Sequence, residues 1–213
     1  MQSLHEQYRP TTFDDVIGQD KAINRFRTVA KRGIGGRCFW ITGKSGTGKT
    51  TIARLIAREL ADPFCIEESN AQDLSIDGVR DLERTMHLYG FGAKSGRAWI
   101  FNEAHKMRTD VVTRLLTTLE ELPDHCIVVF TTTLDGEALF DDVLDSSPLL
   151  SRCVRIPLSQ QGLAKAFAER ARTIAQAEGL DGRPIEQYVR LVNKHGANLR
   201  AVLQSVEAGE MIE

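Results

Sequence analysis

The stretch RCFWITGKSGTGKTTIARLIARELA, residues 37–61, decides the fold. Its first six residues are mostly apolar or aromatic and suit a buried strand, and the part after residue 50 has helical apolar spacing. Between them GKSGTGKT, residues 43–50, fits G-x-x-x-x-G-K-[ST] at every position and in the strand-to-helix context that this motif requires. The stretch therefore predicts a phosphate-binding loop rather than a glycine turn that merely joins a strand to a helix.

The residue types in this loop suit a nucleotide triphosphate. Glycines let successive backbone N–H groups turn inward around phosphates, where the positive end of the following helix adds attraction. Lys49 is expected to neutralise the β and γ phosphates, and the Thr50 hydroxyl to bind Mg²⁺. The predicted cofactors are ATP and Mg²⁺. The candidate binding residues are Gly43, Ser45, Gly46, Thr47, Gly48, Lys49, Thr50 and Thr51.

Strands and helices alternate on both sides of the loop. A helix is predicted over residues 20–33, further buried strands over 97–101 and 126–132, and a helix between those two strands. Such alternation predicts a parallel sheet with helices on both faces. After residue 157 the strand signals stop, and helices are predicted near 160–178, 184–194 and 198–208. We expect an α/β nucleotide-binding domain over residues 1–158 and a small helical lid domain over 159–213.

Polar residues follow the strand at 97–101. Asn102 and Glu103 are expected beside the phosphate loop, because ligands bind at the carboxyl ends of parallel strands. The pair resembles a Walker B motif in which Asn102 replaces the usual aspartate. An amide accepts a hydrogen bond from metal-bound water but brings no charge to Mg²⁺, so Asn102 is expected to weaken turnover. Glu103 matches the glutamate that polarises the attacking water. The alternative is a degenerate site that holds nucleotide without hydrolysis.

With these motifs in order, the chain resembles the AAA+ ATPases, a P-loop NTPase class, and among them the ATP-binding subunits of DNA sliding-clamp loaders. The resemblance covers nearly the whole chain. Residues 8–23 resemble the family's adenine-side signature, which implies base contacts from Tyr8, Arg9, Pro10, Val16 and Ile17. Residues 118–133 resemble the approach to sensor 1, with Thr132 the best match and Thr133 the next. An ordinary threonine-rich strand end is the alternative.

Two arginines carry further roles by the same resemblance. The run Leu150 to Cys153 resembles the S-R-C motif, whose arginine, here Arg152, enters the ATP site of a neighbouring subunit. A guanidinium suits that role because it is always charged and forks onto phosphate oxygens. An arginine that acts in the ATP site of a neighbouring subunit, called an arginine finger in trans, implies a homo- or hetero-oligomer. Arg200 matches sensor 2, although the family's glycine three positions earlier is Ala197 here. For both arginines, a solvated surface side chain is the alternative.

The resemblance implies an ATPase module that couples nucleotide state to remodelling of a DNA-bound protein, most simply the loading of a sliding clamp. The family's cysteine-rich zinc module is not expected, because only Cys65 lies between the Walker motifs. A C-terminal collar is not seen either, which suggests a different assembly or a compact branch such as one of phages or mobile elements. The alternatives are a branch-migration or helicase-loading motor, and a non-hydrolysing switch or scaffold subunit that supplies Arg152.

Composition limits the partners. A net charge of -2 and a pI near 6.2 argue against coating nucleic acid through overall charge, so any DNA contact is local. A basic stretch could meet DNA phosphates, or form a solvated helix face: Lys21, Arg25, Arg27, Lys31, Arg32 and Arg37. The four cysteines lack C-x-x-C spacing and are expected to be reduced, mostly buried thiols. Without a bilayer-length apolar run or a signal peptide, a cytoplasmic location and no membrane partner are expected.

Overall fold

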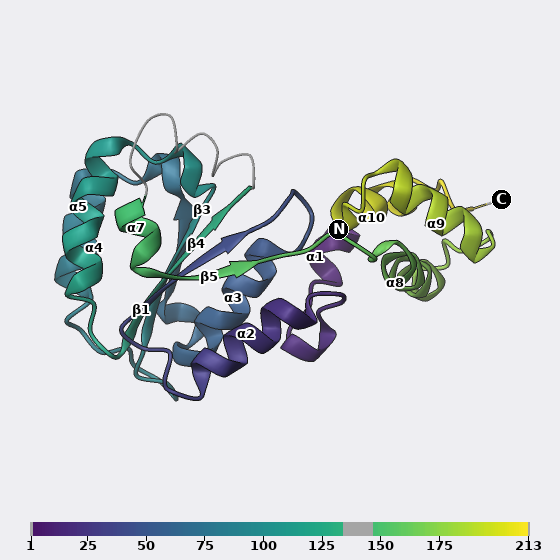
Figure 1. Ribbon diagram of the computed structural model, residues 1–213. Coiled ribbons are helices and arrows are strands. Elements are labelled where there is room, and N and C mark those ends of the chain that lie inside the picture. The colour runs from purple at the N-terminus through teal and green to yellow at the C-terminus, as the bar shows by residue number, and fades with distance from the viewer. Residues whose placement is uncertain (1, 134–146, 213) are drawn as a thin grey trace. The chain divides into compact units, whose positions relative to one another are not determined.

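The computed structural model describes residues 2–133 and 147–212, and these residues include one parallel sheet. Within these residues the strand order is β2-β3-β4-β1-β5 (Figure 1). The strands are β1 (Arg37–Thr42), β2 (Ile66–Asn70), β3 (Arg97–Asn102), β4 (Cys126–Thr132) and β5 (Cys153–Pro157). Every neighbouring pair is parallel. The predicted α/β fold is confirmed.

The strand register brings polar residues to one edge of the sheet. Thr42, the last residue of β1, pairs with Thr132 of β4. Asn102 ends β3, which lies on the other side of β4 and pairs through this residue with Asn70 of β2. Because all the strands run in one direction, their carboxyl ends meet at the edge where the phosphate loop leaves β1.

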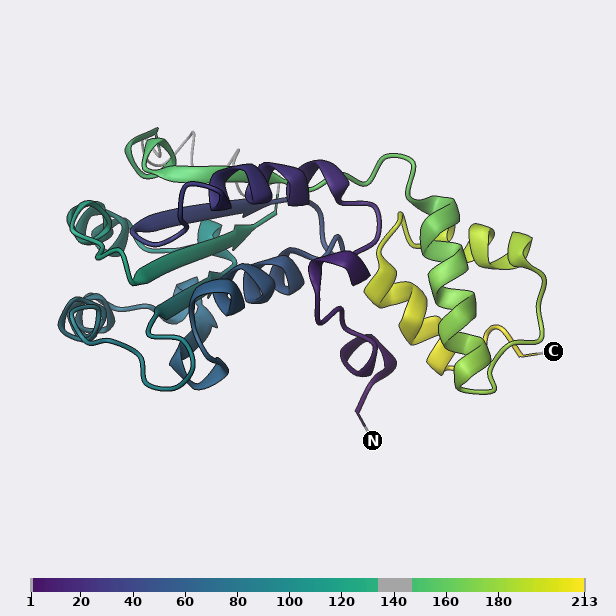
Figure 2. The same cartoon turned by 90° about the horizontal axis from the view of Figure 1, so that it is seen from below.

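Helices cover both faces of the sheet. Figures 1 and 2 show α4 and α5 over one face, and α2 and α3 over the other. The helices of this part are α2 (Asp20–Ala30), α3 (Lys49–Leu60), α4 (Ile76–Thr85), α5 (Thr109–Glu120) and α7 (Ser147–Ser151). Short 3-10 turns lie at Phe13–Asp15, Pro63–Cys65, Ala71–Asp73 and Ala104–Lys106.

Aromatic rings fill the space between sheet and helices. On the α4 and α5 face, the ring of Phe130 lies 5.4 Å from that of Trp40 and 5.6 Å from that of Phe101, measured between centroids. On the other face, the ring of Phe39 meets that of Phe26 in α2 edge-on at 5.8 Å. Neighbouring strand residues point to opposite faces, so the sheet has an apolar layer on each side, as expected for a covered parallel sheet.

The cysteines are packing residues. Cys38, Cys65 and Cys126 are buried, Cys153 is partly buried, and all four are free thiols. Burial raises the pKa of the Cys126 thiol to about 12, so this side chain stays protonated and unreactive at neutral pH. The prediction that the thiols are mostly buried is confirmed.

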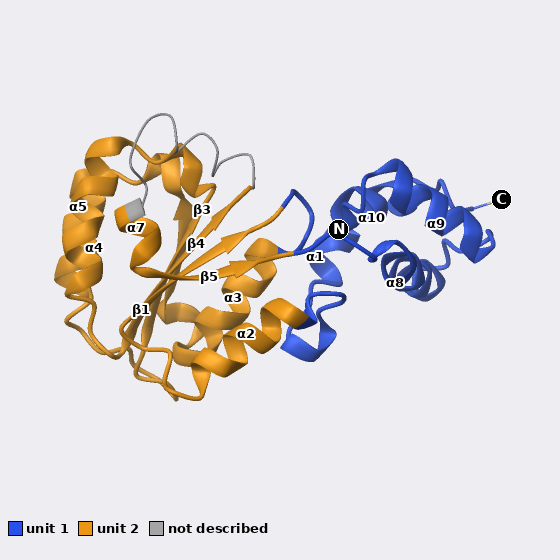
Figure 3. Ribbon diagram, in the orientation of Figure 1, with its two compact units in different colours: residues 1–20, 44–48, 159–213 blue, residues 21–43, 49–158 orange. Residues whose placement is uncertain are grey.

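The chain divides into two compact units (Figure 3). One unit is residues 21–43 and 49–158, and the other is residues 1–20, 44–48 and 159–213. The second unit contains α1 (Leu4–Gln7), α8 (Ala164–Ala177), α9 (Ile185–Lys194) and α10 (Leu199–Glu207). The first 20 residues, which the sequence analysis grouped with the α/β domain, lie with these helices.

The helical unit has its own core. Tyr188 of α9 is fully buried among residues of α8 and α10, and its hydroxyl donates to the Asp181 carboxylate at 2.9 Å. Burial, together with that carboxylate, raises the pKa of Tyr188. α8 begins at Ala164, four residues later than predicted, after a turn in which Gly162 has a φ of 74°.

Five helices and strands of the described residues were not predicted: α1, β2, α4, α7 and β5. β2 has the polar sequence IEESN, and four of its five residues are exposed because it is an edge strand. β5 lies at the opposite edge and is also largely accessible. Edge strands lack the continuous apolar run by which buried parallel strands are recognised, which explains why both were missed.

Backbone strain precedes α10. Gly196 and Ala197 both adopt the left-handed conformation, with φ of 57° and 56°. Glycine adopts the left-handed conformation freely, whereas for a residue with a Cβ atom this conformation costs roughly 1–2 kcal/mol of conformational energy. Ala197 therefore carries local strain at the position where the resembled family has glycine.

Ala197→Gly is expected to raise the free energy of unfolding by about 0.5–1 kcal/mol, because the relieved strain exceeds the chain entropy that glycine adds. Urea unfolding followed by circular dichroism measures the change. Ala208→Gly is the matched control: Ala208 lies at the other end of α10 with an ordinary φ of -76°, so its substitution is expected to lower stability. A loss of stability in Ala197→Gly as well would contradict the assigned strain.

Candidate nucleotide-binding site

Lys49 begins α3 directly after the phosphate loop. The residue is 8% exposed, and its Nζ donates to the carbonyl oxygen of Gly43 at 2.8 Å. The first N–H groups of a helix have no partner within the helix and carry partial positive charge. At the start of α3, the lysine ammonium and these N–H groups together suit an anionic phosphate.

The tip of the loop meets the start of α10, within the helical unit. Gly46 has a φ of 76°, and a Cβ atom there would lie 1.9 Å from Oδ1 of Asn198. That oxygen caps α10 by accepting from the N–H of Ala201 at 3.2 Å. Arg200, the predicted sensor 2 residue, is exposed in the first turn of this helix. Only glycine fits at position 46, and the fit places Arg200 on the helix that touches the loop.

The residues predicted to bind Mg²⁺ lie together. The side-chain oxygen of Asn102 accepts hydrogen bonds from the hydroxyls of Thr50 at 3.1 Å and Thr131 at 2.8 Å. Hydroxyl and carbonyl oxygens are the kind of ligand that Mg²⁺ takes, either directly or through water. These residues therefore fit the predicted cation. Thr131 was not predicted to be part of this site. It reaches Asn102 because its strand, β4, pairs with β3.

Glu103 turns the chain at the end of β3. It has a left-handed backbone, φ 57° and ψ 46°, which is uncommon without glycine and concentrates at functional sites. Its carboxylate lies 3.5 Å from Nε2 of His105, whose Nδ1 lies 3.0 Å from the Thr132 hydroxyl. The structure thus joins the predicted catalytic glutamate to the predicted sensor 1 residue through a histidine to which the sequence analysis gave no role.

Arg152 lies on the surface beside α5. Its Nε donates to Glu120 at 3.0 Å and its Nη1 to the carbonyl of Pro148 at 2.7 Å. The Arg152 side chain is 32% exposed. An exposed ion pair contributes roughly 0–1 kcal/mol, so releasing this guanidinium to another partner costs little.

The predicted adenine-side residues belong to the helical unit. Tyr8 and Ile17 pack against its core, and the Tyr8 hydroxyl donates to Glu178 at 2.6 Å. Nearby, Gln19 donates from Nε2 to the carbonyls of Thr47 at 3.4 Å and Ser159 at 2.8 Å. The remaining predicted residues of this segment, Arg9, Pro10 and Val16, are partly buried. The N-terminal segment therefore lies next to the phosphate loop.

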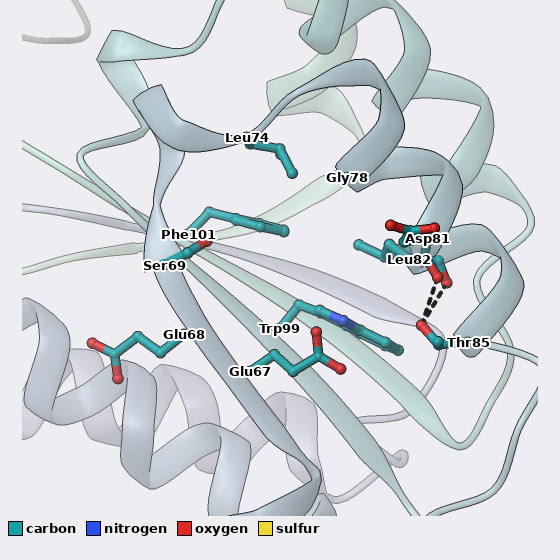
Figure 4. Close-up of a pocket in the computed structure, with 10 residues that line it drawn as sticks. All are labelled: Glu67, Glu68, Ser69, Leu74, Gly78, Asp81, Leu82, Thr85, Trp99 and Phe101. Carbon is teal, nitrogen blue, oxygen red and sulfur yellow. Dashed lines mark hydrogen bonds between the residues drawn. The ribbon is translucent and has the colours of Figure 1, made fainter.

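One cavity of the described residues lies on the other side of β2 and β3 from the phosphate loop's helix α3. It has a volume of about 330 Å³ between β2 and α4 (Figure 4), with Trp99 and Phe101 of β3 on its floor. None of the residues predicted to bind nucleotide lines it. Over residues 2–133 and 147–212 no cluster of three or more His, Cys, Asp or Glu side chains suits a metal ion. Among the helices that the structure describes, none has the length and apolar character needed to cross a membrane.

Comparison with known proteins gives a family and several relatives. The model of the ATPase family associated with various cellular activities (AAA) matches residues 39–158. The Replication factor C small subunit of Haloarcula marismortui is 31% identical over 180 residues, 83% of this chain and 53% of that protein. The DNA polymerase III subunit tau of Bacillus subtilis is 26% identical over 202 residues, 84% of this chain and 34% of that protein. The chain spans about half the length or less of these curated relatives.

A solved structure shows the same fold. The RuvB Holliday junction branch migration motor of Thermotoga maritima matches 94% of this chain and 64% of its own, with a TM-score of 0.70 and 20% identity. At that identity the likeness concerns the fold alone.

Gly46→Ala is expected to weaken ATP binding at least about tenfold, because a methyl group must displace Asn198 at the loop tip. Titration with a fluorescent ATP analogue measures the affinity. Gly162→Ala is the matched control, since Gly162 has a similar φ of 74° in the same unit but open space around it. Equal ATP affinities for the two variants would show that the close contact between Gly46 and Asn198 has no part in nucleotide binding.

Proposed function

The chain belongs to the AAA family of ATPases, and from that membership we propose that it is the ATP-binding and ATP-hydrolysing module of a clamp-loader-like assembly. The module couples its nucleotide state, ATP or ADP with Mg²⁺, to remodelling of a DNA-bound protein. The nucleotide-binding domain ends at residue 158, residues 159–213 act as its lid, and residues 1–20 group with the lid helices. The names of the relatives, which are subunits of replication proteins, favour this function over other roles of the family.

The observation that carries the proposal is the contact of Thr50 with Asn102, 3.1 Å between the hydroxyl and the amide oxygen, with Glu103 next in the chain. Phosphoryl transfer needs a cation ligand beside the phosphate loop and a group that positions the attacking water. Thr50 and Asn102 are the proposed cation ligands, and Glu103 is the proposed group for the water; all three lie at one edge of the sheet.

Each residue then has a separate task. Bound Mg²⁺ supplies neutralisation of phosphate charge, and Thr50 and, through water, Asn102 hold it. Lys49 adds positive charge at the β and γ phosphates, and Arg200 does so from the lid. Glu103 polarises the attacking water. Thr132 senses the γ phosphate.

The assembly is an oligomer in which Arg152 completes the site of a neighbouring subunit. In the single chain Glu120 holds the guanidinium, and a neighbour's phosphate replaces that carboxylate. DNA and a sliding clamp are the proposed partners. The basic stretch on α2 and the turn after it is exposed at Lys21, Arg25, Lys31 and Arg32, which leaves it accessible to a DNA backbone.

Steady-state ATPase assays with and without DNA and sliding clamp test this function. DNA stimulation that rises further with a clamp supports the clamp-loader proposal. DNA stimulation without a clamp effect would favour a branch-migration or helicase-loading motor. Nucleotide binding without turnover under any condition would favour the switch or scaffold subunit.

Glu103→Gln is expected to lower turnover by about 10²–10⁴-fold while MgATP still binds, because the amide cannot polarise water. Single-turnover hydrolysis measures the first effect and nucleotide titration the second. Glu121→Gln, an exposed glutamate at the end of α5, serves as the control and should be fully active. Unchanged turnover in Glu103→Gln would remove Glu103 from catalysis.

Mixing two inactive variants tests the finger. Arg152→Ala and Glu103→Gln are each expected to lack ATPase activity, and an equimolar mixture is expected to recover part of it. Recovery follows because some interfaces join an intact Glu103 to an intact Arg152. The assay is ATPase rate against total protein concentration. Full activity of Arg152→Ala alone, or no recovery on mixing, would contradict a finger that acts between subunits.

A further inference from the structure

The amide of Asn102 is held by partners on both of its ends. Its oxygen accepts from Thr50 and Thr131, and its Nδ2 donates to Oε1 of Glu68 at 2.8 Å. Glu68 belongs to the edge strand β2, in which sequence patterns predicted no element. An aspartate at position 102 would have two equivalent acceptor ends, whereas an asparagine has one acceptor and one donor end, so its orientation matters.

Glu68 decides which way the amide faces. A threonine hydroxyl can donate or accept, so Thr50 and Thr131 tolerate either end of the amide. An ionised carboxylate can only accept, so the NH₂ end of Asn102 must face Glu68. The oxygen end therefore faces Thr50. With the opposite orientation, Asn102 would point two N–H groups toward the side on which the cation is proposed.

The position of Glu68 is itself fixed. Arg54 of α3 donates to it through two nitrogens, Nε to Oε2 at 2.7 Å and Nη2 to Oε1 at 3.2 Å. Thr50 and Arg54 lie four residues apart on α3 and so share one helix face. Glu68 and Asn102 project from adjacent strands to the face of the sheet that α3 covers. The Glu68 side chain is 25% exposed and that of Arg54 36%, so the pair is partly shielded from water.

The neighbouring glutamate offers a comparison. Figure 4 shows Glu67 and Glu68 on opposite sides of β2, with Glu67 beside Trp99. Glu67 and Glu68 carry the same charge at nearly the same place in the chain, yet it is Glu68 that accepts the hydrogen bond from Asn102.

We propose that Glu68 is a positioning residue for the Mg²⁺ site: by binding the NH₂ end of Asn102, it presents the amide oxygen to the cation. The inference rests on the proposed ATP-dependent function. Its chemical basis is that hydrogen bonds around a metal ligand fix the orientation of that ligand, and that donation to a carboxylate makes the amide oxygen a better acceptor. Glu68 thereby allows Asn102 to present an oxygen to Mg²⁺ at the position where the resembled family has aspartate.

The proposal predicts opposite effects of Glu68 in two backgrounds. With Asn102, removal of Glu68 frees the amide to rotate and weakens Mg²⁺ binding. In the Asn102→Asp background no orientation needs fixing, and Glu68 lies against a second carboxylate, which repels it. There, removal of Glu68 is expected to leave Mg²⁺ binding unchanged or to strengthen it. The Asn102→Asp variant with Glu68 intact is consequently expected to gain less Mg²⁺ affinity than its added negative charge suggests.

A double-mutant cycle tests the proposal without relying on turnover. The full chain and its variants Glu68→Ala, Asn102→Asp and the double variant are titrated with a fluorescent ADP, with and without Mg²⁺. The readout is the Mg²⁺ concentration at which nucleotide affinity is half enhanced. Glu67→Ala is the matched control, and thermal melting checks that each variant folds. Glu68→Gln keeps an acceptor oxygen and is expected to have an intermediate effect should the alanine variant be unstable.

In the Asn102 background, Glu68→Ala is expected to raise the half-saturating Mg²⁺ concentration about 10–100-fold with Mg²⁺-free affinity unchanged. Glu67→Ala is expected to match wild type. An equal effect of Glu68→Ala in both backgrounds, or no effect in either, would overturn the positioning role while leaving ATP binding intact. No nucleotide binding by the wild-type chain would overturn the proposed function as well.

Discussion

The fold and the proposed site both depend on the turn between β1 and α3. β1 is an interior strand of the sheet, flanked by β4 and β5, so the chain that leaves its carboxyl end emerges among the other strand ends. Because α3 starts there, its first turn brings the Thr50 hydroxyl to 3.1 Å from the oxygen of Asn102. This topology brings the phosphate loop, a cation ligand and a carboxylate to the same edge of the sheet.

Much of the fold could be predicted because its centre is built from clear patterns. The strands at 37–42, 97–102 and 126–132 are buried apolar runs, and the loop motif defines the first of them. β2 and β5 were missed because they are edge strands whose residues are largely accessible and lack such runs. Sequence spacing also does not show that residues 1–20 group with the helical unit, since this depends on contacts between distant segments.

The candidate site was predictable in its residues and not in their partners. Thr50, Asn102 and Glu103 follow from motif position, but strand register is needed to place Thr131 and Glu68 on Asn102. His105 has no motif spacing, and its role as a link between Glu103 and Thr132 follows from the left-handed turn at Glu103. The asparagine that seemed a weakness of the motif has partners at each end that hold it in one orientation.

The most direct test of the account is isothermal titration calorimetry of MgATP into the folded chain and into Lys49→Ala. Lys49 is buried at the start of α3 with its ammonium on the loop carbonyl of Gly43, so its charge lies where phosphates are proposed to bind. The account predicts saturable binding to the wild-type chain and none, or far weaker binding, to the variant. Absence of binding heat with well-folded wild-type chain, or equal binding by both proteins, would contradict it.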